Sequence, residues 1–226
     1  MALKYTHRIH PRSRSIRISV NHQGEVVVTS PRFVSARQIA GFIDKSRPWL
    51  EQALAKARER PVFGVTADWV MIFGKKYRRL VESDSAQPPG VTVQQDKVIT
   101  NLWSQTTSTK QAPDQKLLTR FLKSTATNYI LPRAHQLALV MKTKIGRITL
   151  REQKTRWGSC SSQGNLNFNW RLVHCPTAVI DYVIIHELAH RTHMNHSASF
   201  WQLVARYDPE YPVHRGWFKR HGLSLD

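Results

Sequence analysis

Polar and apolar residues alternate along much of the first hundred residues, and this pattern predicts β-strands. Residues 15–20 alternate strictly, which is the period of a strand with one buried face. The apolar run 26–28 predicts the strand that returns after turn residues at 21–24. Two further strand pairs are expected at 69–73 with 77–81 and at 91–94 with 98–102.

A helical insert is predicted between these strands. Ser35 and Gln38 have the spacing of a capping box, so a helix is expected over 36–45. Pro48 then breaks that helix or begins a second one, which continues to about residue 59.

The pattern changes near residue 113. Residues 104–113 are polar and contain Pro, Ser and Thr, which is typical of a linker. The sequence therefore predicts two domains, a strand-rich N-terminal unit at 1–105 with a helical insert and a second unit at 114–226.

The second unit is predicted to be rich in helices. Asp114 can cap a helix with apolar residues at helical spacing, and Pro132 is expected to kink or end it before residues 134–141 continue. Strands are expected at 148–156 and 165–172, joined by the small-residue loop 158–164. Three more helices are expected at 176–191, 198–206 and 212–221, the second of them capped by Ser197.

The chain is strongly basic. Its 34 Lys and Arg against 15 Asp and Glu give a formal net charge of +19. The excess is spread over both halves, because 18 basic and 8 acidic residues precede Pro113 and 16 and 7 follow it. Such a surface attracts nucleic acid or nucleotides without sequence preference, or anionic membrane, although positive charge can also serve solubility alone.

The chain shows none of the sequence signals of secretion or membrane insertion. Residues 1–12 lack the apolar stretch of a signal peptide, and no run approaches the roughly 20 apolar residues of a membrane span. Cys160 and Cys175 are too few for a disulfide scaffold. We therefore expect a cytoplasmic protein that does not associate with a membrane.

The helix predicted at 176–191 contains the motif His186-Glu187-Leu188-Ala189-His190. Histidines four residues apart share one helical face and can bind one metal ion, while the glutamate can act as general base toward a metal-activated water. A pair of surface histidines is the alternative. Apolar residues cover nearly the whole circumference of this helix, which indicates that it is buried and favours the metal site.

A catalytic zinc site usually has three protein ligands, and His196 is the best candidate for the third. It lies six residues after His190, so the chain can leave the helix, turn at Asn195 and return a side chain to the ion. His193 is the rival, but it would lie a full turn beyond the site on a continued helix.

These residues resemble the YgjP-like family of zinc metallopeptidases, which is related to the SprT-like and WLM proteases. The resemblance lies in the motif at 186–190, in Asn195-His196-Ser197 and Phe200-Trp201, and in the segments 155–160 and 166–172. It implies that His186, His190 and His196 bind the metal and that Glu187 is the catalytic base. Both peptidase and nucleotide pyrophosphatase roles have been assigned in this family.

Other residues carry weaker signals. Residues 156–160 can form an edge strand that pairs with a substrate backbone, or a hairpin end with a core tryptophan. Cys160 with His174 as a nucleophile pair is less expected than a buried structural thiol, and the tyrosines at 182, 207 and 211 are more simply packing residues than oxyanion donors. On the last predicted helix, a solvated face is expected rather than a phosphate site at Arg215, Lys219 and Arg220.

Together these features predict an α+β protein, with a small strand-rich N-terminal unit before a zincin-like catalytic unit whose short sheet packs on the metal-binding helix. The expected function is a zinc-dependent hydrolase that cleaves peptide bonds in a peptide or protein substrate. The alternatives are a metal-dependent pyrophosphatase of nucleoside triphosphates such as UTP, and a nucleic-acid-associated protease or binding protein. The sequence does not predict an oligomeric state.

Overall fold

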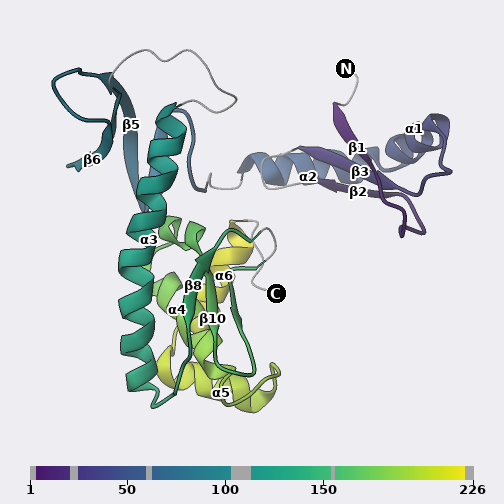
Figure 1. Ribbon diagram of the computed structural model, residues 1–226. Helices are drawn as coiled ribbons and strands as arrows, with labels where there is room; N and C mark the ends of the chain where they lie inside the picture. The colour runs from purple at the N-terminus through teal and green to yellow at the C-terminus, as the bar shows by residue number, and fades with distance from the viewer. Residues whose placement is uncertain (1–3, 21–24, 60–62, 103–112, 154–155, 222–226) are drawn as a thin grey trace. The chain divides into compact units, whose positions relative to one another are not determined.

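Ten strands in three small sheets and six α-helices make up the part of the chain that the computed structural model describes, which is residues 4–20, 25–59, 63–102, 113–153 and 156–221 (Figure 1). The chain divides into two units, Met1–Val62 with Lys219–Leu223 and Phe63–Phe218 with Ser224–Asp226. This division lies upstream of the predicted linker, nearly all of which falls outside the described residues. The domains at 1–105 and 114–226 stay a prediction.

The N-terminal unit is a three-stranded sheet with two helices packed on one of its faces. Its elements are β1 (Tyr5–Ile9), β2 (Arg17–Val20), β3 (Val26–Ser30), α1 (Ala36–Lys45) and α2 (Arg47–Glu59). The central strand β3 is parallel to β1 and antiparallel to β2. Val26 and Val28 of β3 pack against Ile39, Ile43 and Leu50 of the helices, and this cluster is the core of the unit.

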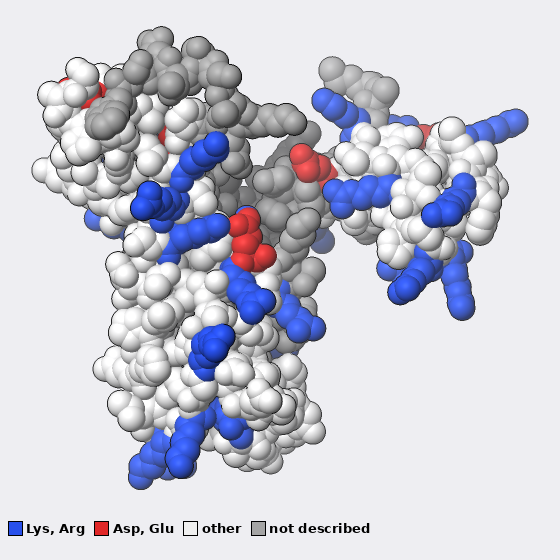
Figure 2. Space-filling model, in the orientation of Figure 1, with Lys and Arg blue, Asp and Glu red and all other residues white. Residues whose placement is uncertain are grey.

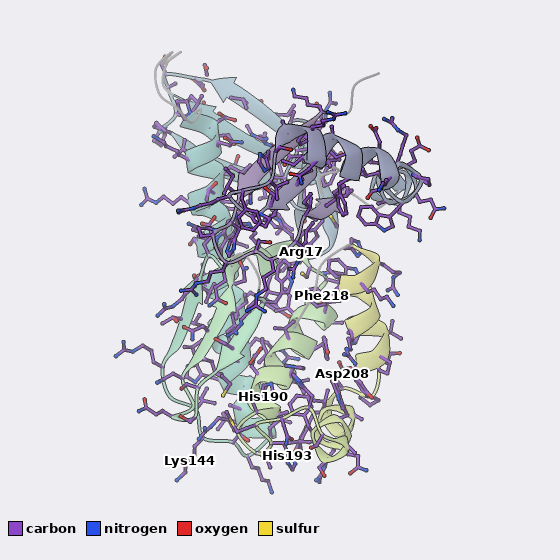
Figure 3. All side chains as sticks on the ribbon, turned by 90° about the vertical axis from the view of Figure 1, so that its right-hand side faces the viewer. Arg17, Lys144, His190, His193, Asp208 and Phe218 are labelled. Atoms are coloured by element: carbon purple, nitrogen blue, oxygen red, sulfur yellow. The ribbon has the colours of Figure 1, made fainter. Side chains whose placement is uncertain are left out.

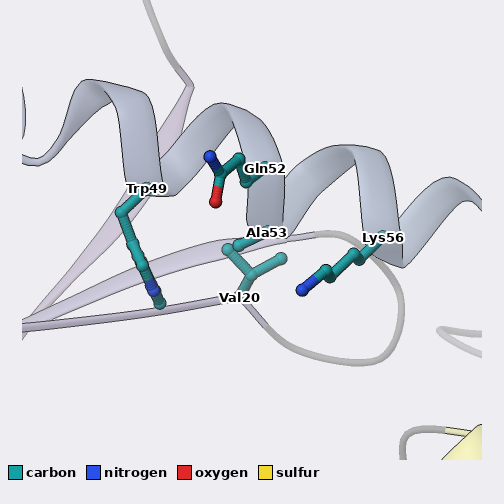
Figure 4. A pocket seen from close by; sticks show the side chains of 5 residues that line it. All are labelled: Val20, Trp49, Gln52, Ala53 and Lys56. Atoms are coloured by element: carbon teal, nitrogen blue, oxygen red, sulfur yellow. The ribbon is translucent and has the colours of Figure 1, made fainter.

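The predicted pair β2 and β3 is confirmed, as are both helices and the Ser35–Gln38 capping box. The turn predicted at 21–24 lies outside the described residues. Strand β1 was not predicted, because all five of its residues are exposed and it has no buried face to create an alternation. A hollow of about 250 Å³ lies between β2 and α2 (Figure 4). It is lined by Val20 of β2 and by Trp49, Gln52, Ala53 and Lys56 of α2.

A four-stranded sheet opens the second unit, in the order β4–β5–β7–β6. Its strands are β4 (Trp69–Ile72), β5 (Lys75–Ser83), β6 (Gly90–Gln94) and β7 (Lys97–Leu102). Both predicted strand pairs are present as antiparallel ladders. The turn between β4 and β5 needs glycine at Gly74, since its φ is +78° and an added Cβ would lie 2.9 Å from Pro176 Cγ. This turn therefore packs closely against the start of the helix that carries the candidate site.

The long helix α3 (Pro113–Val140) continues through Pro132 (Figure 1), so of the two predicted outcomes, a kink or an end, the end is wrong. Proline removes one backbone hydrogen bond and usually costs a helix about 3 kcal/mol. One buried face runs along both halves and stabilises the continuous helix; its residues are Leu118, Leu122, Ala126, Ile130, Ala134, Leu137 and Ala138. Arg133 Nη2 also lies 2.6 Å from Asp181 Oδ2, which ties this helix to α4.

The third sheet lies beside the candidate site and has the order β8–β10–β9. Its strands are β8 (Ile148–Arg151), β9 (Gly158–Cys160) and β10 (Leu166–Asn169), and the 3₁₀ helix η1 (Trp170–His174) follows. Both predicted strands are present as β8 and β10 but are shorter than expected, and the loop predicted to join them is wrong in part. The start of the expected loop forms β9, which is antiparallel to β10, and residues 170–172 turn into η1.

Three helices complete the second unit: α4 (Thr177–Ala189), α5 (Ala198–Tyr207) and α6 (Tyr211–Arg220). Each was predicted, and Ser197 caps α5 by accepting a hydrogen bond from the backbone of Phe200. Helix α4 is buried from Val179 to Ala189 except at Asp181, as its apolar circumference indicates. The α+β fold is thus confirmed, including a short sheet packed on α4. No helix of the described residues is long and apolar enough to cross a membrane.

Candidate metal centre

Three histidines converge at the C-terminal end of α4. His186, His190 and His196 each offer one ring nitrogen, and these nitrogens all lie within 4.8 Å of one another. His186 lies on α4 and His190 is its C-cap residue, one helical turn further, and their ring centroids are 5.0 Å apart. His196 comes from the segment before α5, and its Nε2 lies 3.1 Å from Nε2 of His186. The sequence singled out all three, and the structure brings them together.

His193 is not part of this group, but its backbone supports it. The carbonyl oxygen of His193 lies 3.0 Å from Nδ1 of His190 and accepts a hydrogen bond from it. A bond to one ring nitrogen fixes the tautomer and orientation of a histidine and leaves the other nitrogen as a ligand. Figure 3 labels both residues at the same end of the second unit, at the end of α4 and just beyond it.

Phe200 packs against all three histidine rings of the cluster. This role was not predicted from the sequence. The fully buried ring of Phe200 lies 4.9, 4.7 and 4.9 Å from the rings of His186, His190 and His196, respectively. Trp201 stacks on His196 with 5.6 Å between ring centroids. The helical spacing of Phe200 and Val204 was a usable signal for a buried face, since both side chains are buried in α5.

The spacing and protonation state of the cluster fit a metal-binding site. A tetrahedral ion with Zn–N bonds of about 2.0–2.1 Å holds two ligand nitrogens about 3.3 Å apart, close to the separation of the two Nε2 atoms. Burial, followed by repulsion from His190, His196 and Arg215, lowers the pKa of His186 to about 3. The ring is therefore neutral near pH 7, as a metal ligand must be. Its Nδ1 is buried without a hydrogen-bond partner among the described residues.

Glu187 lies beside the cluster and is almost completely buried. The backbone of β9 passes directly over it, since a Cβ added to Gly158 would come 2.7 Å from Glu187 Cγ. Cys160 lies close enough to Glu187 to be affected by its charge. Burial, and after it the negative charge of Glu187, raises the pKa of the Cys160 thiol. The carboxylate of Glu187 therefore lies where α4 meets β9, the edge strand of the third sheet.

Helix α6 places Tyr211 and Arg215 against Trp201 of α5, and these three residues form an aromatic and cationic wall beside the cluster. Trp201 stacks on Tyr211 at 5.3 Å, and the Arg215 guanidinium lies 4.6 Å above the Trp201 ring. At the start of this wall, Nδ1 of His214 lies 2.9 Å from a carboxylate oxygen of Asp208, the residue labelled in Figure 3. Arg215 is thus near the cluster, where it disfavours a protonated His186.

The weaker sequence candidates are not assembled into a second site. His174 bonds the carbonyl oxygen of Met71 at 2.6 Å, whereas the Cys160 thiol donates to the carbonyl of Ser161, so these two do not form a nucleophile pair. Tyr182 is a buried packing residue whose ring meets His186 edge-on at 6.0 Å. Trp157 is buried, as expected for a core residue, and Thr155 of the same motif lies outside the described residues.

Comparison with known proteins adds a family to this geometry. A family model described as YgjP-like, metallopeptidase domain, matches residues 14–221. The chain is similar to the crystal structure of the metallopeptidase zymogen of Pyrococcus abyssi abylysin, with 18% identity and a TM-score of 0.40 over 43% of this chain and 99% of that one. It is also similar to the crystal structure of the metallopeptidase zymogen of Methanocaldococcus jannaschii jannalysin, with 20% identity and a TM-score of 0.37 over 40% of this chain and 94% of that one. Neither similarity is strong enough to carry residue roles across, and no curated protein matches the chain.

Proposed function

The chain belongs to the YgjP-like metallopeptidase family, and on that premise we propose that it is a zinc peptidase whose ion is held by His186, His190 and His196 and whose general base is Glu187. The observation that carries this proposal is the convergence of three imidazole nitrogens beside a buried carboxylate that is not one of them. Three imidazoles suit zinc better than magnesium or calcium, which prefer oxygen ligands.

The chemistry divides between the ion and the protein. Zinc bound at such a site lowers the pKa of a water molecule and polarises a carbonyl group. In this mechanism Glu187 would accept the proton of the attacking water and later return it to the leaving amine. Its burial keeps competing water away, and Phe200 holds the three rings in one orientation from below.

The edge strand β9 is placed to bind the substrate backbone. Among the described strands it pairs with β10 alone, so its other edge can offer backbone groups to an extended peptide. Gly158 of this strand lies directly at Glu187. A peptide that pairs with β9 would therefore pass the proposed base, which supports a protein or peptide substrate.

Peptide hydrolysis is favoured over the pyrophosphatase alternative, since the family is one of metallopeptidases.

A reducing cytoplasm also fits the chain, because both cysteines are free thiols and the fully buried Cys175 has a pKa well above its ordinary value.

The substitution Glu187→Gln tests the proposal. The glutamine side chain would be nearly isosteric but could not accept the proton, so proteolysis of an unfolded casein-like protein should fall by roughly 10²- to 10⁴-fold. Metal analysis should find about one zinc per chain in both proteins, because Glu187 is not a ligand. Wild-type activity in the variant would remove Glu187 from the mechanism. If Glu187→Gln lost only the hydrolysis of nucleoside triphosphates, the pyrophosphatase alternative would replace the proposed peptidase.

A further inference from the structure

Basic side chains gather around a hollow in the N-terminal unit. The hollow has a volume of about 750 Å³ and lies along β2 and the segment that precedes it. Three arginines and a histidine line it together with hydroxyl-bearing residues; the full set is His10, Arg12, Ser13, Arg14, Ser15, Arg17, Ile18, Ser19 and Thr29. No acidic side chain belongs to this described lining, so its electrostatic potential is positive.

The arginines around the hollow differ from three arginines of the second unit that are held in ion pairs. Arg12, Arg14 and Arg17 are exposed, and within the described part of the chain none of them forms an ion pair. In the second unit, by contrast, three arginines pair with carboxylates: Arg79 with Asp114, Arg133 with Asp181 and Arg171 with Glu152. Both halves of the chain carry a similar excess of charge, but the charge around the hollow is not neutralised by its neighbours.

The strand register extends the basic surface across the sheet. Arg17 of β2 and Arg8 of β1 both align with Thr29 of the central strand, so the three side chains point to the same face. The helices α1 and α2 cover the opposite face through Val26 and Val28. Figure 2 shows Lys and Arg side chains projecting from several sides of this unit, with few acidic side chains in view.

We infer that this hollow binds the phosphodiester backbone of nucleic acid. Arginine presents a planar fork of donors that matches phosphate oxygens, and the hydroxyls of Ser15 and Thr29 add neutral donors beside it. A membrane-binding surface would need apolar side chains to enter the bilayer, whereas Ile18 is the single apolar residue in the described lining. Contacts of this kind recognise no base edge, so binding should be independent of sequence.

This inference does not rest on the proposed catalytic mechanism. The hollow is built from residues of β2, β3 and the segment before β2, none of which belongs to the candidate metal centre. A nucleic-acid site in the same chain would concentrate the peptidase near proteins bound to the same nucleic acid.

The test is a binding titration of the full-length protein with a labelled DNA oligonucleotide, single-stranded and duplex, between about 50 and 200 mM salt. The variant R12Q/R14Q/R17Q removes three charges from the hollow. Its matched control, R37Q/K45Q/K56Q, removes three exposed charges from α1 and α2 of the same unit. We expect the first variant to lose at least about tenfold in affinity and about 2–3 units of the salt slope, since each phosphate contact contributes about 0.9. The control should lose less than about threefold.

Two outcomes would overturn the inference. Equal losses in the two variants would show diffuse attraction to net charge, and binding to vesicles that contain phosphatidylserine without binding to DNA would show a membrane surface. Circular dichroism and thermal unfolding that match wild type check that the N-terminal unit of R12Q/R14Q/R17Q is folded, and cleavage of a short peptide without DNA present should be the same in both proteins. Because that readout uses the metal centre alone, a failure of the proposed peptidase is distinguishable from a failure of the nucleic-acid site.

Discussion

Glu187 lies so close to the backbone of β9 that residue 158 has no room for a side chain. We therefore expect Gly158→Ala to displace the carboxylate and to lower peptidase activity by roughly 10- to 100-fold, because small misplacements of a catalytic group are costly. Bound zinc should be unchanged, since the three atoms nearest to an added Cβ all belong to Glu187, which is not a proposed ligand. Gly41→Ala is the matched control, because a Cβ there meets nothing within 4 Å. A fully active Gly158→Ala would show that Glu187 can move without loss of function.

The two histidines that follow α4 provide a second test at this scale. His196→Ala removes a ring nitrogen from the cluster and should strongly weaken zinc retention during dialysis. His193→Ala keeps the backbone carbonyl that bonds His190, so its effect should be mild. Metal content of the purified variants gives the comparison. The reverse order of effects would show that His193, not His196, completes the site.

At the scale of elements, η1 buries a histidine whose protonation is linked to stability. The ring of His174 donates from Nδ1 to the carbonyl of Met71 on β4, so it joins η1 to the four-stranded sheet. Burial, and to a lesser extent the charge of Arg171, lowers its pKa from 6.5 to about 4 although the bond to Met71 acts in the opposite direction. The unfolded chain therefore binds a proton at pH values where the folded chain does not.

The consequence is a loss of stability in mild acid. The contribution of His174 is complete above pH 6.5 and is lost as the pH falls toward 4, by about 1.4 kcal/mol per pH unit over that window. Denaturant unfolding at several pH values should show a shallower pH dependence in His174→Gln than in wild type. His135→Gln, a change at an exposed position on α3, should keep the wild-type dependence. Equal slopes in wild type and His174→Gln would contradict the assignment.

At the scale of the whole molecule, charge has two different roles. In the second unit, arginine–carboxylate pairs join separate elements, as Arg79 of β5 does with Asp114 at the start of α3. In the N-terminal unit, the arginines around the hollow have no such partners among the described residues. The net charge of +19 alone cannot show this difference, because it counts residues and not their neighbours.

Local signals in the sequence determined much of the fold and the main elements of the candidate site. Caps such as Ser35 and Ser197 act within a few residues of themselves, so the helices that they begin were predicted correctly. Likewise, the four-residue spacing of His186 and His190 places both rings on one face of any helix that contains them. The alternating strands were found for the same reason wherever one face is buried.

Only the tertiary structure decided the features that depend on residues far apart in the chain. Helix α3 continues through Pro132 because its buried face outweighs one lost hydrogen bond, and a local rule cannot weigh that packing. The strand β9 exists because β10 pairs with it, and the contact of Gly158 with Glu187 joins two segments that share no sequence pattern. The ring of His196 reaches the cluster because the chain turns back after α4 and Phe200 packs beneath all three histidines. Such long-range packing fixes the position of a side chain only when the whole core is assembled.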